Sequence, residues 1–207
     1  MNIDYLKNEY SDGEPIFLSE LKSSSEGYLR QQVKRFADNG QLMRVCNGVY
    51  YLPYKTILGT EGKMSIKKYI EKKFMKCSNQ EIGYYTGLNL ANQYGFTTQN
   101  PACYEVCSNA ATTKCRKIFI DNTEIIVYKP QVYINKGNIK ILKFLDLLLC
   151  IEKYCELPLE VAKKKINKIM MEWNLRIDLL DKYLQLYPLK VYKSVYKYCG
   201  GFANGLV

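Results

Sequence analysis

Apolar residues recur at helical spacing early in the chain. Leu29, Val33 and Phe36 lie at positions i, i+4 and i+7, so an α-helix would carry them on one face. The pattern predicts a helix that ends at about residue 38, because the Asn-Gly pair at 39–40 is a typical C-terminal stop. Most other positions of this helix are polar and are expected to face solvent.

The segment before this helix carries apolar residues and a start signal. The apolar residues at 16–18 and 21 predict a short buried helix directly after Pro15. Ser23 and Glu26 have the spacing of a capping box, in which each side chain satisfies a free backbone amide at a helix start. A helix, a turn and a second helix are therefore expected in that order.

A β-hairpin is predicted after the second helix. Two β-prone runs flank the Asn-Gly pair at 47–48, which is the strongest short hairpin signal. A type I′ turn at that pair would set Cys46 opposite Val49. Arg44 would then lie opposite Tyr51.

Helix, turn, helix and hairpin in this order predict a winged helix-turn-helix over residues 1–55. In that fold the second helix enters the major groove of DNA and the hairpin forms the wing. The polar face of the helix at 26–38 carries residue types that reach phosphates and base edges. The residues expected to contact DNA are Ser25, Gly27, Arg30, Gln31, Lys34, Arg35, Arg44 and Asn47.

The chain has a net charge of +10, and the charge is unevenly distributed. Residues 1–29 hold two lysines against six acidic residues, whereas residues 30–60 hold five basic residues against one aspartate. A basic balance attracts polyanions. The alternative is a lysine-rich surface that only keeps the protein in solution. The second basic block falls on the predicted winged helix, which favours duplex DNA as the partner.

The rest of the chain combines strand-like and helical patterns after a linker at 56–62. A helix at 63–77 would turn Tyr69, Ile70 and Phe74 inward. Further expected elements are a helix at 83–94, strands at 102–107, 117–120 and 124–128 with a turn at 121–122, and helices at about 139–156, 159–173, 176–187 and 189–198. The predicted fold class is α+β, in which the N-terminal winged helix-turn-helix is followed by a mixed α/β domain (63–207) that ends in a helical bundle.

Two groups of lysines on these predicted helices are candidates for a second nucleic-acid contact. They would reach DNA beside the operator, or RNA, and interleaved tyrosines could stack on bases. The alternative is a solvated lysine face with tyrosines that fill the core. The residues are Lys67, Lys68, Lys72, Lys190, Lys193 and Lys197.

The composition removes several classes of chemistry. The chain has no histidine, which excludes Ser-His and Cys-His pairs and histidine metal ligands. Its eight cysteines include no C-x-x-C pair, so neither a zinc site nor any other metal or cofactor is expected. We expect reduced thiols, mostly packed as small apolar groups.

One acidic cluster is a candidate nuclease site. Asp121, Glu124 and Lys129 lie on strand-like sequence, and acids with a lysine can hold Mg²⁺. Aspartate is ordinary at a hairpin turn, however, and an odd spacing puts Glu124 and Lys129 on opposite faces of a strand. The chain is therefore not expected to be an enzyme. It has no signal peptide and no apolar run of membrane-spanning length, so a cytoplasmic protein that does not enter a membrane is expected.

Two stretches of the chain carry a family resemblance. Residues 29–53, through Gly48, Val49, Tyr50 and Pro53, resemble the N-terminal domain of the AbiEi-type antitoxins of type IV toxin–antitoxin and abortive-infection systems. Residues 83–101 are similar to the domain that follows in such proteins. The matching residues there are Gly83, Tyr84, Thr86, Gly87, Gly95, Thr97, Thr98, Gln99 and Pro101.

The resemblance implies a DNA-binding antitoxin that represses its own operon at an inverted repeat in its promoter. The partner gene would encode a nucleotidyltransferase-like toxin, which the second domain would counter with or without binding it. The wing tip of the family is often basic, whereas this chain has Cys46 and Asn47 there, so Arg44 would have to compensate. The alternative function is a transcription regulator without a toxin, whose C-terminal domain senses a ligand or a redox state.

Overall fold

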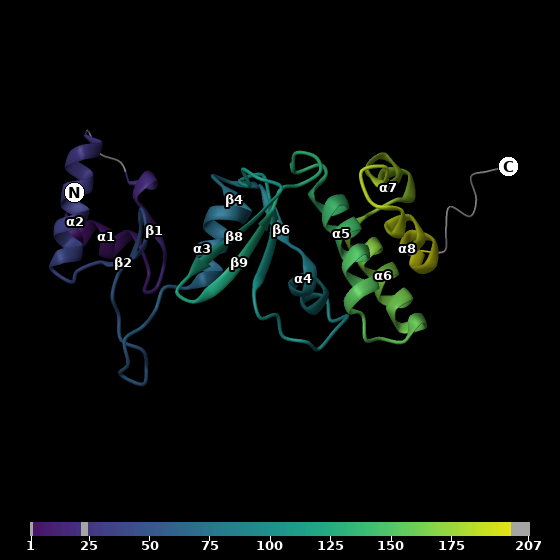
Figure 1. The fold of residues 1–207 in the computed structure, drawn as a ribbon, viewed down its shortest axis with the longest axis horizontal. Helices are drawn as coiled ribbons and strands as arrows, with labels where there is room; N and C mark the ends of the chain where they lie inside the picture. The colour runs from purple at the N-terminus through teal and green to yellow at the C-terminus, as the bar shows by residue number, and fades with distance from the viewer. Residues whose placement is uncertain (1, 22–24, 200–207) are drawn as a thin grey trace. The chain divides into compact units, whose positions relative to one another are not determined.

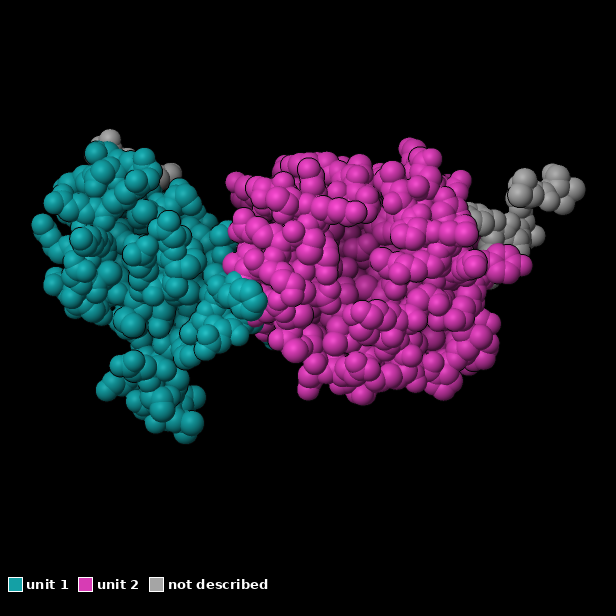
Figure 2. Space-filling model, in the orientation of Figure 1, with its two compact units in different colours: residues 1–73, 119–123 teal, residues 74–118, 124–207 magenta. Residues whose placement is uncertain are grey.

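The chain is an α+β protein that divides into two compact units (Figures 1 and 2). The computed structural model describes residues 2–21 and 25–199. Unit 1 comprises residues 1–73 and 119–123, and unit 2 comprises residues 74–118 and 124–207. Each unit has its own hydrophobic core and is described by itself.

Two helices of unit 1 bury apolar residues in its core, of which only the second was predicted from the sequence. Helix α1 (Ile3–Glu9) buries Ile3 and Leu6. Helix α2 (Glu26–Asp38) buries Leu29 and Val33, and partly buried Phe36 packs against the same core, as the stripe predicts. Its N-cap is Ser25, whose side chain accepts a hydrogen bond from the amide of Tyr28. The predicted cap residue Ser23 lies outside the described residues.

The short helix predicted after Pro15 is wrong. Ile16–Phe17 form strand β1, and only a 3₁₀ turn, η1 (Leu18–Glu20), follows. Strand β1 pairs antiparallel with β3 (Val49–Tyr51), so the backbone groups of Ile16 and Phe17 are satisfied by a distant strand rather than by a local helix. Strand β2 (Met43–Cys46) completes a sheet of order β1-β3-β2.

The β2–β3 hairpin forms with one difference in register. Cys46 lies opposite Val49, as predicted, but Arg44 pairs with Tyr50 instead of Tyr51 because the register shifts between Arg44 and Cys46. Of the turn pair only Gly48 takes a positive φ, of 74°. The turn is therefore not type I′, which needs positive φ at both central residues.

Unit 1 also contains the segment at 63–73, which the sequence pattern groups with the second domain. Helix α3 (Ile66–Ile70) continues into a π-helical turn, η2 (Glu71–Met75). Tyr69, Ile70 and Phe74 are buried, as predicted. The ring of Tyr69 packs 5.6 Å from that of Phe17 in β1, centroid to centroid, which explains why this segment clusters with unit 1.

Unit 2 is built on a four-stranded sheet of order β6-β7-β9-β8. Its strands are β6 (Gly83–Tyr85), β7 (Tyr104–Ser108), β8 (Cys115–Ile120) and β9 (Thr123–Tyr128), and a small hairpin, β4 (Lys76–Cys77) with β5 (Gln80–Glu81), precedes them. Strand β7 runs antiparallel to β6 and parallel to β9. The predicted turn joins β8 to β9 with positive φ at both Asp121 and Asn122.

The helix predicted at 83–94 is shorter than expected. Residues 83–85 form β6, and helix α4 (Gly87–Gln93) begins only after Thr86. Tyr84 and Tyr85 pair with Cys107 and Val106 of β7, so partners far along the chain override the local helical pattern.

The C-terminal helices match the predicted segments closely. They are α5 (Ile139–Tyr154), α6 (Leu159–Trp173), α7 (Ile177–Leu184) and α8 (Leu189–Cys199). Helix α5 supplies the centre of the unit 2 core and packs against α4, α7 and α8, whereas α6 packs against α8. Among the described residues, no helix combines the length and apolar character that a bilayer crossing requires.

Candidate nucleic-acid interface

A groove of about 750 Å³ runs over unit 1 between α2 and the β2–β3 hairpin. It is lined by residues of α2, of the hairpin, of β1 and η1, and by Lys73. Its lining includes Arg30, Lys34, Arg44 and Asn47, four of the residues that the sequence pattern selects for DNA contact. The sequence pattern placed them on two separate elements, and the fold brings them to one concave surface.

The charge of this groove is positive but not uniformly so. Its cations are Arg30, Lys34, Arg44 and Lys73, and its acids are Glu26 and Asp38. Nη2 of Arg30 lies 2.7 Å from Oε1 of Glu26, one helical turn away. Lys73 was not among the predicted contact residues, although its neighbours Lys67, Lys68 and Lys72 were named as candidates for a second contact.

The exposed edge of α2 extends beyond the groove. Gln31 and Arg35 are exposed there but do not line the groove. Gly27 is also exposed, and a Cβ added to it would meet only Oγ of Ser25, at 4.0 Å. Packing among residues 2–21 and 25–199 therefore does not require glycine at this position.

Local contacts hold the hairpin wall in place. Nη2 of Arg44 donates a hydrogen bond of 3.1 Å to Oδ1 of Asn47, across the turn. The amide of Leu18 donates to the carbonyl of Gly48 at 2.9 Å, which ties the turn to η1. The guanidinium of Arg44 is thus oriented by Asn47 rather than left to sample many rotamers.

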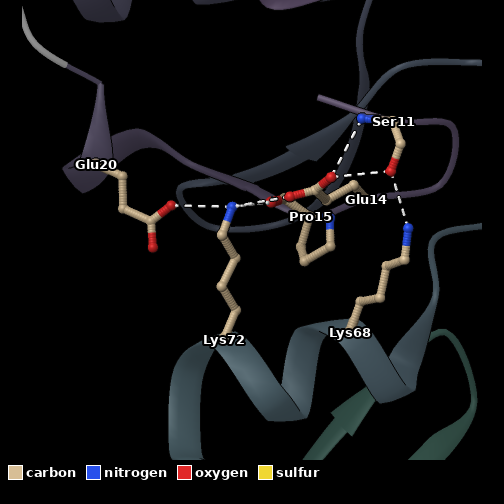
Figure 3. A network of polar contacts seen from close by, with 6 residues as sticks. All are labelled: Ser11, Glu14, Pro15, Glu20, Lys68 and Lys72. Carbon is tan, nitrogen blue, oxygen red and sulfur yellow. Dashed lines mark hydrogen bonds and ion pairs between the residues drawn. The ribbon is translucent and has the colours of Figure 1, made fainter. Parts of the chain in front are cut away.

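Most of the lysines of α3 and η2 that were predicted as a second contact are engaged within unit 1 (Figure 3). Nζ of Lys72 lies 3.4 Å from a carboxylate oxygen of Glu14 and 3.3 Å from one of Glu20, and it donates to the carbonyl of Pro15 at 3.2 Å. Nζ of Lys68 donates to Oγ of Ser11 at 2.9 Å. The charge of Lys72 is therefore compensated inside the unit. Lys67 is exposed.

The lysines of α8 lie on the surface of unit 2. Lys190, Lys193 and Lys197 are all exposed. Nζ of Lys197 is 3.4 Å from Oε1 of Glu152 on α5 and 4.9 Å from the ring centroid of Tyr198. Tyr198 is itself buried. These contacts are those of a helix packed on a core, with lysines along its outer edge.

The acids considered for a nuclease site pair with separate lysines. Asp121 forms an ion pair of 3.2 Å with Lys63, and Glu124 one of 2.7 Å with Lys117. The hydrogen bond and the charge of Glu124 raise the pKa of Lys117. Across residues 2–21 and 25–199, no group of three His, Cys, Asp or Glu side chains could hold a metal ion.

Burial makes several thiols unreactive. It raises the pKa of Cys107, Cys150 and Cys199 to about 12 in each case, so these groups remain protonated at neutral pH, whereas a reactive cysteine needs the thiolate. Cys107 and Cys150 are buried, as predicted, but Cys77 and Cys115 are exposed.

The second motif, at residues 83–101, makes contacts inside unit 2. Oγ1 of Thr86 donates to Oδ2 of Asp146 on α5 at 3.1 Å. The amide of Thr98 and Nε2 of Gln99 each donate to the carboxylate of Glu156, just beyond α5, at 2.8 Å. The polar residues of this motif therefore attach α4 and the following loop to α5.

Neither the family models nor the curated proteins matched the chain. The resemblance to the AbiEi-type antitoxins therefore rests on the motif residues and stays a prediction.

Proposed function

We propose that the chain is a DNA-binding repressor whose unit 1 is a winged helix-turn-helix. The observation that carries the proposal is the convergence of Arg30, Lys34, Arg44 and Asn47 on one groove between α2 and the hairpin. Phosphate contacts of this kind supply most of the affinity of a protein for duplex DNA.

The order of elements supports the same function. Unit 1 contains α1, β1, η1, α2 and the β2–β3 hairpin in sequence, with a sheet of order β1-β3-β2. In a winged helix the helix before the hairpin is the one that reads DNA, and the hairpin is the wing. Here that helix is α2, and the short turn η1 stands where a fuller helix was expected.

The two surfaces of α2 would contact different parts of the DNA. Its exposed edge, with Gln31 and Arg35, presents side chains that can reach base edges in a major groove about 12 Å wide. The adjacent groove, with Arg30, Lys34 and Arg44, would receive the sugar–phosphate strand that borders that major groove.

A gel shift with a duplex that covers the region upstream of the chain's own gene tests this function. The full-length protein should retard the duplex, and Arg30→Ala with Arg35→Ala should abolish the shift. A double variant of exposed unit 2 lysines, Lys164→Ala with Lys182→Ala, removes the same charge and should shift normally. Normal binding by the arginine variant would rule out α2 as the DNA-reading helix.

We further propose that the repressor is an AbiEi-type antitoxin, with duplex DNA and a nucleotidyltransferase-like toxin as its partners. Its support is the pair of motifs at 29–53 and 83–101. A toxin of that type, encoded beside the gene, would be co-expressed with the full-length chain. The full-length chain should relieve the toxicity of this toxin. The Arg30→Ala, Arg35→Ala variant should relieve toxicity equally, since the antitoxin activity is assigned to unit 2. No relief by either protein would exclude the antitoxin function while leaving the repressor intact.

A further inference from the structure

Unit 2 carries most of the net positive charge of the chain. Its residues, 74–118 and 124–207, include 18 lysines and arginines against 10 aspartates and glutamates. The net charge of unit 2 is therefore +8, out of +10 for the whole chain. A surplus of this size attracts polyanions, and it lies outside the unit that contains the DNA groove.

A hollow of about 350 Å³ lies on unit 2 where the end of α4 meets α6. Tyr94 and Gly95 line it directly after α4, and Lys165 and Lys168 line it from α6. Nζ of Lys165 donates a hydrogen bond of 2.9 Å to the carbonyl of Gly95, which ties the two helices together beside the hollow. The hollow has the volume of a small-ligand site, and it offers an aromatic ring together with ammonium groups.

The ring of Tyr94 also belongs to an aromatic cluster. Its centroid lies 5.4 Å from that of Trp173, at the end of α6, and the two rings meet edge to face. Nζ of Lys143 on α5 lies 5.2 Å from the centroid of Tyr94 and 5.4 Å from that of Trp173. All three residues are partly exposed. Because Tyr94 lines the hollow as well, the cluster and the hollow form one surface.

The positive charge of Lys143 is not balanced by an acidic group. The two rings attract a cation but cannot neutralise it, and no carboxylate in the described part of the chain is paired with it. The ammonium of Lys165 is held by a neutral carbonyl. Of the three lysines at this surface, Lys168 alone has an acidic partner among the described residues, Glu172 at 3.8 Å. The surface therefore combines aromatic rings with a surplus of positive charge.

We propose that this surface of unit 2 binds single-stranded nucleic acid, with a base stacked on Tyr94 and phosphates on Lys143 and Lys165. Proteins bind single strands through aromatic rings combined with basic groups, because the bases of a single strand are free to stack on them. A duplex hides the faces of its bases, and an acidic protein has none, so neither would use the rings. The inference goes beyond the proposed function, since it gives unit 2 a nucleic-acid ligand that does not depend on the groove of unit 1.

The fluorescence of Trp173, the single tryptophan of the chain, reports binding at this surface. The full-length chain would be titrated at about 0.1 M NaCl with an oligouridylate of about ten nucleotides, with the DNA strand of the same length and with a duplex. Both single strands should change the emission. The duplex should leave it unchanged, and polyglutamate, which has charge without bases, should bind at least about tenfold more weakly. A difference between the RNA and the DNA strand identifies which of the two is preferred.

Four variants separate stacking from charge, with a labelled single strand followed by anisotropy. Tyr94→Leu should weaken binding at least about fivefold, whereas Tyr94→Phe keeps the ring and should bind as the wild type does. Lys143→Gln should also weaken binding about fivefold, because one phosphate contact to a single strand contributes about 0.7 to the slope of log K against log salt. Lys114→Gln, exposed and outside the hollow, removes the same charge and should bind normally.

Three results would overturn the proposal. They are an unchanged affinity of Tyr94→Leu, an equal loss in Lys143→Gln and Lys114→Gln, and an emission of Trp173 that responds to the duplex as it does to the single strands. The gel shift that tests the groove of unit 1 is a separate measurement, so its failure would leave this inference standing.

Discussion

Glu26 and Arg30 form an ion pair one turn apart on α2, with 2.7 Å between Oε1 of the glutamate and Nη2 of the arginine. Their side chains are 76% and 65% exposed, and both residues line the groove of unit 1. An exposed pair at this spacing stabilises a helix by only about 0.3–0.5 kcal/mol. Arg30 can therefore leave Glu26 for a phosphate at little expense in free energy.

Replacing Glu26 with glutamine should separate DNA affinity from stability. Loss of the negative charge removes both the competitor for Arg30 and its repulsion of phosphates, so duplex affinity should rise roughly three- to eightfold at 0.1 M salt. The free energy of unfolding should fall by about 0.5 kcal/mol, because an acid in the first turn favours the helix. Anisotropy titrations and urea denaturation measure the two effects. Weaker binding by the variant would show that Glu26 is not a competitor.

Asp146 should make unit 2 less stable as pH rises. Burial of its carboxyl raises its pKa from 3.8 to about 6, against the hydrogen bonds from Tyr84, Thr86 and Tyr187. The folded state thus favours the neutral carboxyl. Its contribution to the free energy of unfolding is fully present below about pH 4 and is lost as pH rises through 6. Relative to Asp146→Asn, the wild-type free energy of unfolding should fall by up to about 3 kcal/mol between pH 4 and 7.

The fluorescence of Trp173, the single tryptophan of the chain, reports the unfolding of unit 2 in this experiment. Asp181→Asn on the exposed face of α7 is the matched control, and because it keeps Asp146 its free energy of unfolding should fall with pH as that of the wild type does. An identical pH dependence for wild type and Asp146→Asn would contradict the assignment of the shift to this carboxyl.

The contribution of Glu156 to stability should have the opposite pH dependence and increase as pH rises. Hydrogen bonds from the backbone amide of Thr98 and from Gln99 lower its pKa to about 2. The ionised form is favoured in the folded state, so its contribution is present above about pH 4.5 and is lost as pH falls towards 2. Glu156→Gln should therefore lower Tm at pH 7, and the difference from wild type should close near pH 2. Glu81→Gln, exposed on β5, serves as control in the same thermal melts.

Gly87 should not tolerate a side chain. Its φ is +60°, and a Cβ there would lie 2.1 Å from Oε1 of Glu105. Backbone strain and the displaced carboxylate together should lower the free energy of unfolding by about 3 kcal/mol for Gly87→Ala. Gly95→Ala has similar strain, at φ +63°, but meets only the flexible end of Lys165, so it should cost about 1 kcal/mol. Equal effects in urea denaturation would show that the contact with Glu105 adds nothing.

Elements with strong local periodicity could be predicted from the sequence. The stripe of Leu29 and Val33 placed α2 correctly, and α5 to α8 lie within a few residues of their predicted bounds. Strand β1 could not be found, because two residues carry no periodicity and Ile16–Phe17 become a strand only through pairing with β3. The same holds for β6, whose partner β7 lies beyond α4 in the chain.

The residues of the candidate site differ in the same way. Some can be recognised from the local sequence pattern, and others only from contacts with residues far away in the chain. Arg30 and Lys34 were found from one helix face, because exposure follows from periodicity. No local pattern distinguishes Lys72 from Lys73. The contacts of Lys72 with Glu14 and Glu20, and that of Lys73 with Phe17, all involve residues more than fifty positions earlier in the chain.

Unit 1 is discontinuous along the chain, since it combines residues 1–73 with 119–123. The polypeptide therefore passes from one unit to the other after residues 73, 118 and 123, and one proteolytic nick cannot release unit 1 intact. A chimaera that contained only the first 55 residues would lack Lys73. It would also lack Lys72, whose ammonium group pairs with Glu14 and Glu20. Transplanting the complete module into another protein would require α3 as well, and a designed replacement for the 119–123 tip, including Ile120, which is buried.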